Sequence, residues 1–186
     1  MKKLLILFLL TGVFSVSQAQ VDLENSSVKW TGTQISGKSH YGSLSFKSAD
    51  VSFNGNELVG GSFVVDMNSL SVDDLSGKGK KSLEGHLMSN DFFSVEMFNT
   101  SELKIEKVTK TGNNKYNATA NLTIKGATHS AQVSFVLNDE SNTMTAKLVF
   151  DRSKYDVRYG SGSFFENLGD KLILDDIELE VTLVMM

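Results

Sequence analysis

Apolar and polar residues alternate along most of this chain. Between residues 116 and 124 every second side chain is apolar, and the same period runs from residue 177 to residue 183. Successive side chains on a strand point to opposite faces, so each segment is expected to form a strand with one apolar and one polar face. The pattern predicts an all-β protein whose strands bury their apolar faces against one another.

Further strand candidates follow one another with short turn signals between them. Asn54-Gly55 between two apolar runs is typical of a hairpin turn. Gly60-Gly61 inside the next run indicates a bulge or a sharp bend. Strands are expected at 28–34, 42–47, 50–53, 58–67, 101–109, 115–125, 131–138, 144–150 and 171–185. A sandwich or a closed barrel would bury their apolar faces, and only the closed barrel removes unpaired edges.

The alternation breaks between residues 73 and 93. Gly77 and Gly79, with lysines at 78, 80 and 81, predict a mobile loop there. Leu83, Leu87 and Met88 follow at helical spacing, so one short helix is predicted over residues 82–89.

The first 19 residues have the features of a secretory signal peptide. Lys2 and Lys3 precede an apolar stretch over residues 4–16, and Ser17 and Ala19 are small residues suited to a cleavage site. The stretch is shorter than the roughly 20 residues that span a bilayer. We therefore predict cleavage after Ala19, one domain over residues 20–186, no integral membrane span, and a periplasmic or secreted location.

The composition of the chain limits which ligands and partners it is expected to bind. Without Lys2 and Lys3, 16 of the 18 basic residues remain against 22 acidic ones. This balance gives no basic surface for nucleic acid. The chain has no cysteine, so no thiolate is available as a metal ligand. No metal or other cofactor is expected, and a homodimer is left open.

The candidate polar chemistry is sparse. His40, His86 and His129 do not have metal-ligand spacing, and there is no nucleophile motif. Arg152 and Arg158 are the only arginines. Either could hold a polar head group at a barrel mouth, although a structural ion pair of Arg152 with Asp151 or Asp170 is the more ordinary interpretation.

Several segments, in the same order, resemble the YceI-like family of exported bacterial proteins. The segment that breaks the strand pattern, LEGHLMSNDFF at 83–93, carries the strongest resemblance. The others are GKSHYGSL at 37–44, GSFVVDMNSL at 61–70, NLTIKGAT at 121–128, DRSKY at 151–155 and GD at 169–170. The resemblance implies a lipocalin-like antiparallel β-barrel of about eight strands that encloses a polyisoprenoid or another long-chain lipid.

On this basis we predict a lipid-binding protein and not an enzyme. The residues expected to line its cavity are Trp30, Phe46, Phe63, Val65, Leu122, Ile124, Phe135, Leu148 and Phe150. Those expected at the mouth are His40, His86, Arg152 and Arg158, with Phe164 and Phe165 as a gate. Two alternatives stay open: a plugged barrel that binds a protein partner through residues 73–81, and a hydrolase or isomerase that uses His40, His86 and Arg152.

Overall fold

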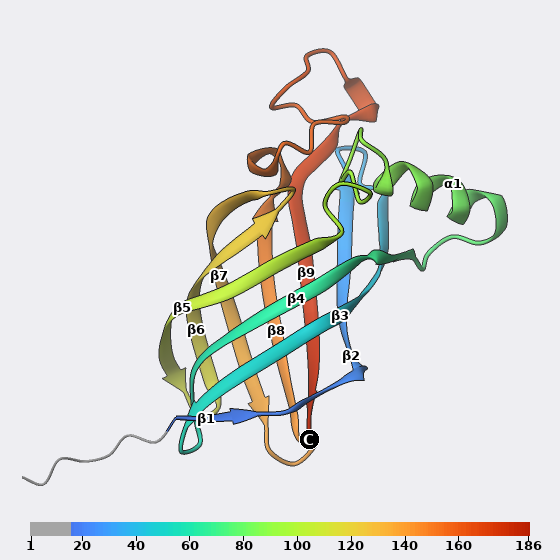
Figure 1. The fold of residues 1–186 in the computed structure, drawn as a ribbon. Helices are drawn as coiled ribbons and strands as arrows, with labels where there is room; N and C mark the ends of the chain where they lie inside the picture. Colours follow the sequence, from blue (N-terminus) through green and yellow to red (C-terminus); the bar gives the residue numbers. More distant parts are fainter. Residues whose placement is uncertain (1–15) are drawn as a thin grey trace, which may run out of the picture.

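Eight antiparallel strands close into a barrel in the computed structural model, which describes residues 16–186 (Figure 1). Each strand pairs with the next along the chain, and β9 pairs with β2 to complete the ring. The barrel strands are β2 (Val21–Gln34), β3 (Ser39–Asn54), β4 (Glu57–Val72), β5 (Thr100–Gly112), β6 (Lys115–Ile124), β7 (Ala127–Asn138), β8 (Thr143–Asp151) and β9 (Ile173–Met185). The predicted all-β, lipocalin-like barrel is thus confirmed.

Most of the predicted signal peptide lies outside the described residues. Its last four residues, Val16–Ala19, form the short strand β1. This strand pairs with β3 between Val51 and Asn54, beside the part of β3 that β2 does not reach. The proposed cleavage after Ala19 stays a prediction.

Alternating burial follows the sequence pattern closely in β6. Buried and more exposed residues alternate along its whole length, with Tyr116, Ala118, Ala120, Leu122 and Ile124 facing inward. The Asn54-Gly55 hairpin joins β3 to β4 as predicted, and Gly55 has a φ of 58°. The bulge predicted near Gly60 is present: Ser52 pairs with Gly60 and Phe53 with Leu58, which leaves Val59 without a partner.

One predicted interruption is a bulge and not a turn. The segments 42–47 and 50–53 were expected as separate strands, but both belong to β3. Phe46 pairs with Val65 and Ser48 with Val64, so Lys47 is an extra residue in an unbroken ladder. Like a turn, the bulge interrupts the two-residue alternation of apolar and polar residues, but the strand continues in the same direction.

The predicted helix is longer than the sequence indicated. Helix α1 (Gly77–Met88) includes the lysines that were expected in a mobile loop. Lys80 Nζ donates to Ser71 Oγ at 3.0 Å and lies 3.6 Å from Glu84 Oε1. Glu84 accepts a hydrogen bond from the amide of Val72. These contacts fix the first turns of α1 to the end of β4.

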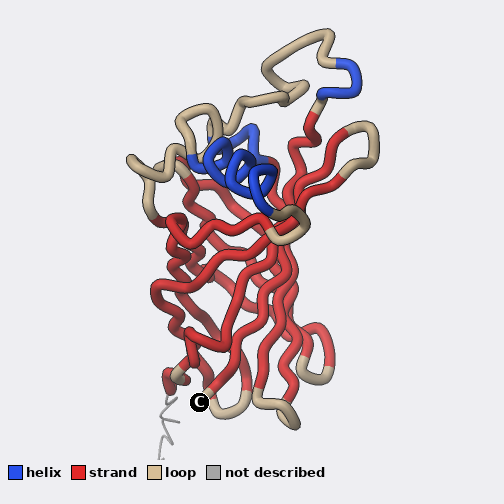
Figure 2. The backbone as a smooth tube through the Cα atoms, turned by 90° about the vertical axis from the view of Figure 1, so that its right-hand side faces the viewer, coloured by secondary structure: helices blue, strands red, loops and turns tan. Residues whose placement is uncertain are grey.

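The two ends of the barrel differ. Figure 2 shows α1 and the long connections gathered at one end, which we call the upper end, and short turns at the other. The connection from β8 to β9 contains the short 3-10 helices η1 (Arg152–Tyr155) and η2 (Gly169–Lys171). Near the lower turns, Val51, Leu58, Tyr116 and Met144 are almost completely buried. These apolar side chains are therefore shielded from solvent at the lower end.

Candidate functional site: an apolar cavity with a polar mouth

A cavity of about 360 Å³ occupies the barrel interior. Inward-facing side chains from all eight barrel strands contribute to its wall, and nearly all of them are apolar. The buried Val51, Leu58, Tyr116 and Met144 are not part of this wall. The hollow part of the barrel therefore lies above a packed floor.

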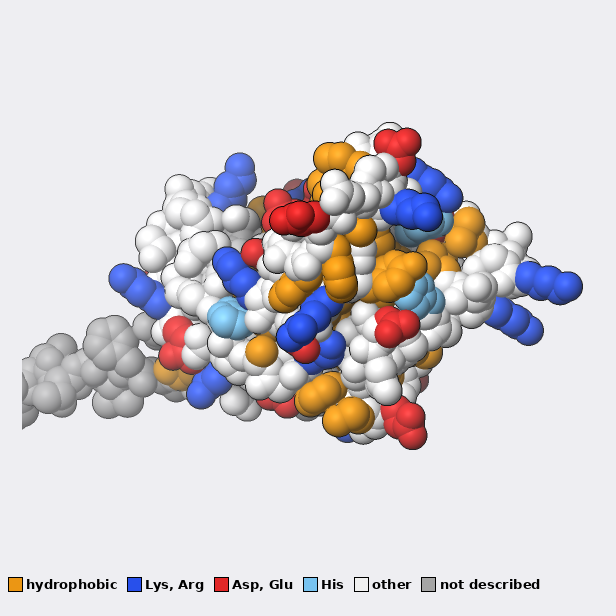
Figure 3. Space-filling model, turned by 90° about the horizontal axis from the view of Figure 1, so that it is seen from above, with side chains coloured by type: hydrophobic (Ala, Val, Ile, Leu, Met, Phe, Trp, Pro, Cys, Tyr) orange, Lys and Arg blue, Asp and Glu red, His pale blue; other side chains and the backbone are white. Residues whose placement is uncertain are grey.

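The mouth of the cavity is at the upper end. Among the wall residues, Gln34, His40 and His86 are partly exposed, and Tyr159 is exposed. Seen from above, hydrophobic side chains gather near the centre of this end, with histidine side chains beside them (Figure 3). We use "the mouth" for this opening, defined by Gln34, His40, His86 and Tyr159.

All nine residues expected to face a ligand lie in the cavity wall. Phe46 and Phe63 have ring centroids 6.4 Å apart across β3 and β4. The full set is Trp30, Phe46, Phe63, Val65, Leu122, Ile124, Phe135, Leu148 and Phe150. Their contact with a ligand stays a prediction, because their positions establish only the shape and polarity of the wall.

Trp30 is held in the wall by two local features. Its indole Nε1 donates to the carbonyl oxygen of Ser71 at 3.1 Å. Gly42 lies beneath the ring: a Cβ at this position would be 2.8 Å from Trp30 Cζ2 and 1.8 Å from the Ser71 oxygen. A larger residue at position 42 would displace the ring or open the pairing of β3 with β4.

Several wall residues were not predicted from the sequence. Leu83 and Leu87 reach the cavity from α1, and Phe92, Phe93 and Tyr159 reach it from the connections at the upper end. The apolar spacing of Leu83 and Leu87 is visible in the sequence. Nothing local indicates that their apolar face covers the barrel opening rather than a sheet.

His40 forms the most specific polar contact at the mouth. Its Nδ1 lies 2.7 Å from Oδ2 of Asp74, and the other carboxylate oxygen of Asp74 accepts from the amide of Tyr41 at 3.1 Å. Burial works to raise the pKa of Asp74, but the hydrogen bonds from His40 and Tyr41 outweigh it and hold that pKa below its ordinary value of 3.8. Asp74 is therefore an ionised acceptor at neutral pH.

His86 is positioned by aromatic packing. Its ring meets Tyr159 edge-on at 4.3 Å between centroids and Phe92 at 5.3 Å. Both histidines expected at the mouth are therefore there, one fixed by a carboxylate and one by aromatic rings.

Arg152 does not face the mouth, contrary to the sequence-based expectation. Its side chain is 0% exposed, and its nitrogens donate to four main-chain carbonyl oxygens. Its carboxylate partner is Asp175, at 3.3 Å, and not Asp151 or Asp170. Burial lowers the pKa of the guanidinium, although the nearby carboxylates act to raise it. With its donors directed at the protein, Arg152 is structural, and it is not available to an enzyme site of His40, His86 and Arg152.

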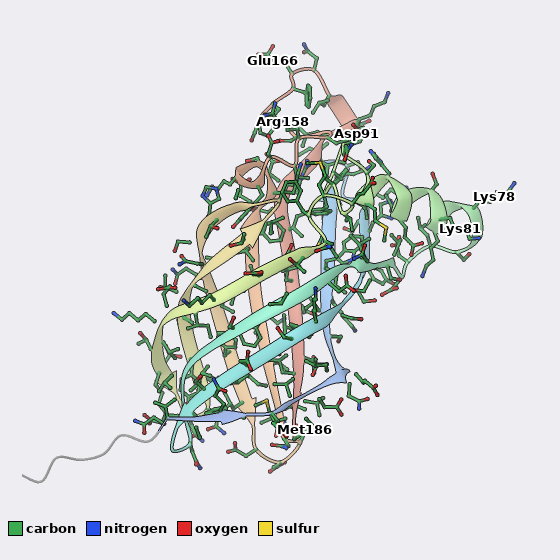
Figure 4. The ribbon with its side chains drawn as sticks, viewed as in Figure 1. Lys78, Lys81, Asp91, Arg158, Glu166 and Met186 are labelled. Atoms are coloured by element: carbon green, nitrogen blue, oxygen red, sulfur yellow. The ribbon has the colours of Figure 1, made fainter. Side chains whose placement is uncertain are left out.

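Arg158, Phe164 and Phe165 lie above the wall and not in it. Arg158 is paired with Asp156, and its guanidinium lies 5.1 Å from the ring centroid of Phe164. Phe164 and Phe165 are 40% and 50% exposed. Figure 4 shows Arg158 and Glu166 in the connection that rises over the upper end of the barrel.

Residues 16–186 contain no cluster of three or more His, Cys, Asp or Glu side chains that could hold a metal ion. Within the same residues, no helix is both long and apolar enough to cross a membrane.

The fold and cavity define an antiparallel β-barrel with one packed end and an apolar interior that opens at the other. The model of the YceI-like domain matches residues 20–185, and the chain belongs to this family. The structure of BcnA from Burkholderia cenocepacia is similar, with a TM-score of 0.67 and 23% identity over 88% of this chain and 98% of that one. The YceI protein of Campylobacter jejuni gives a TM-score of 0.54 and 19% identity over 76% and 82% of the two chains. No curated protein matches the sequence.

Proposed function

We propose that this protein binds the apolar chain of a lipid inside its barrel, to carry or sequester it outside the cytoplasm after removal of residues 1–19. The observation that carries this proposal is the apolar cavity between a packed floor and a polar mouth. A barrel plugged by its own side chains, which would suit a module that binds only proteins, would leave no such space.

The cavity volume gives the scale of the enclosed chain. At roughly 30 Å³ per methylene-sized group, close to the volume of a water molecule in the liquid, about 360 Å³ accommodates about a dozen carbons. This is two or three isoprene units or a medium-length acyl chain.

Burial of such a chain provides ample driving force. At about 0.8 kcal/mol per methylene group, a dozen carbons contribute on the order of 10 kcal/mol before the costs of ordering the ligand. Dispersion contacts with the aromatic wall add to this value.

Trp30 provides a direct test, because it is the only tryptophan in the chain and lies in the cavity wall. We expect a dodecyl chain brominated near its end to quench Trp30 fluorescence saturably, since bromine quenches at contact. The unbrominated chain is the matched control and should compete with the brominated one. Absence of quenching by brominated alkyl, acyl and prenyl chains would contradict the proposal.

We also propose that Phe164 and Phe165 act at the entrance. Both rings are exposed on the connection above the mouth, so they can contact an apolar chain before it enters. Replacing both with serine is expected to slow loading while changing the free energy of unfolding by no more than about 0.5 kcal/mol each. Stopped-flow quenching of Trp30 measures the rate.

The control for this variant is the double change Val136→Ser and Val149→Ser. These apolar residues are similarly exposed, at 42% and 54%, on strands β7 and β8 of the barrel. If the control slows loading as much as the change at Phe164 and Phe165, the entrance role is wrong.

A further inference from the structure

His40 presents one unpaired ring nitrogen at the mouth. Its Nδ1 is taken by Asp74, whereas Nε2 makes no hydrogen bond to the residues that the structure describes. In residues 16–186, the one side-chain polar atom that is sealed from solvent and makes no hydrogen bond is Oδ1 of Asp175, which is ion-paired with Arg152. Nε2 of His40 is therefore accessible to solvent, and His40 is one of the residues that line the mouth.

Asp74 determines which ring nitrogen of His40 carries the hydrogen. An ionised carboxylate can only accept hydrogen bonds, so the ring nitrogen that faces it must carry the hydrogen. In the neutral imidazole this leaves Nε2 as an acceptor. The ring of His86, the other histidine of the mouth, packs against Phe92 and Tyr159. It makes no hydrogen bond to the described residues that would determine which of its nitrogens carries the hydrogen.

We propose that the mouth selects an amphiphile whose polar end is a hydroxyl group, which donates its hydrogen to Nε2 of His40. The ligand class is a long-chain alcohol or phenol, with its tail in the apolar cavity. This inference rests on the proposed function, because it assigns the polar end of the same ligand. Asp74 is a positioning residue that acts through the tautomer of His40.

The geometry around Asp74 makes one substitution especially informative. In the wild type the main-chain N–H of Tyr41 donates to Asp74 Oδ1 at 3.1 Å. In Asp74→Asn the side-chain oxygen must still accept this hydrogen bond. The amide NH₂ group is then left to face Nδ1 of His40, which becomes the acceptor. The hydrogen of His40 moves to Nε2, so the mouth offers a donor where the wild type offers an acceptor.

The test compares 1-dodecanol with its isomer 1-methoxyundecane, which has the same atoms but no O–H group. Each competes with a fluorescent alkyl probe for the purified protein in the same mildly alkaline buffer. We expect the wild type to bind the alcohol about tenfold more tightly, the effect of one hydrogen bond together with its otherwise unpaired acceptor. In Asp74→Asn the ratio should fall towards one, because both ligands can accept from Nε2–H.

Asp73→Asn is the matched control. Asp73 is the neighbouring carboxylate, but it contacts Ser71 and Lys80 and has no bond to His40. This variant should keep the wild-type preference for the alcohol. Equal binding of alcohol and ether by the wild type would overturn the inference and leave the proposed function intact, whereas failure of both ligands to compete would overturn both.

A second measurement does not depend on ligand binding. The ¹⁵N chemical shifts of the His40 ring report directly which nitrogen carries the hydrogen. We expect a hydrogen on Nδ1 alone in the wild type and on Nε2 alone in Asp74→Asn. A wild-type ring protonated at Nε2 would overturn the inference even if the variant fails to fold.

Discussion

Replacing Arg152 with alanine is expected to lower the free energy of unfolding by about 3–5 kcal/mol. The guanidinium is 0% exposed and donates to the carbonyl oxygens of Leu174, Val157, Tyr159 and Ile173 at 2.9 to 3.2 Å. Truncation leaves these acceptors without their donor and the Asp175 carboxylate without its ion-pair partner. Each buried group left unpaired is destabilising by about 1–3 kcal/mol.

Because of where these acceptors lie, we expect the loss of stability to be concentrated in one region. Val157 and Tyr159 begin the connection above the barrel, and Ile173 and Leu174 begin β9, so Arg152 holds the two ends of this connection together. Urea unfolding measures the global effect. Amide hydrogen exchange should show the earliest loss of protection in residues 157–174.

Arg158→Ala is the matched control, because this arginine follows Arg152 by six residues but its side chain is 60% exposed. Its stability should remain within about 0.5 kcal/mol of the wild type. Arg152→Lys should recover only part of the loss, since an ammonium cannot reproduce the planar set of donors. An Arg152→Ala variant as stable as Arg158→Ala would show that the buried guanidinium is not what holds this connection.

Replacing Ala146 with phenylalanine is expected to abolish binding of a dodecyl chain, with affinity reduced by more than about tenfold, or 1.4 kcal/mol. Ala146 lies in the cavity wall on β8, between Phe135 on β7 and Val181 on β9. An aromatic ring at this position enters the space that the ligand would occupy. The existing cavity accommodates the ring, so the variant should fold.

Thr145→Phe is the control on the same strand. Its side chain is exposed, so the added ring points away from the cavity. Quenching of Trp30 by the brominated chain compares the two variants. Wild-type affinity in a folded Ala146→Phe protein would mean that the chain binds somewhere other than this cavity.

The strand pattern predicted the strands and their inward faces, because each apolar face in the sequence lies on the inside of the barrel wall. The choice of a closed barrel over a sandwich came from the resemblance to the YceI-like family. Residues 115–124, for example, form β6 with the predicted alternation, and the strand ends one residue before the predicted end at 125. Local pattern did not distinguish a bulge at Lys47 from a turn, since both interrupt the two-residue period. It also missed the first turns of α1. Lys80 and Glu84 are held there by Ser71 and Val72 at the end of β4, and these polar contacts have no signal in the apolar pattern.

The apolar part of the site could be predicted, and its polar part could not. Phe46 and Phe135 fall on the apolar faces of their strands in the sequence, and both lie in the cavity wall. The partner of His40 is Asp74, 34 residues away, and the surroundings of Arg152 depend on how residues 157–174 fold over the barrel. Pairings of this kind are set by tertiary structure and leave no periodic signal in the sequence.

Mass spectrometry of the protein purified from its native envelope fraction tests the central claim most directly. The account predicts a native mass above that of the chain, and a denaturing spectrum in which the additional mass is lost and recovered in the organic extract. The released molecule should contain an apolar chain, and under the further inference it should end in a hydroxyl group. A bare chain in the native spectrum, unchanged after incubation with alkyl, acyl and prenyl lipids, would contradict the account.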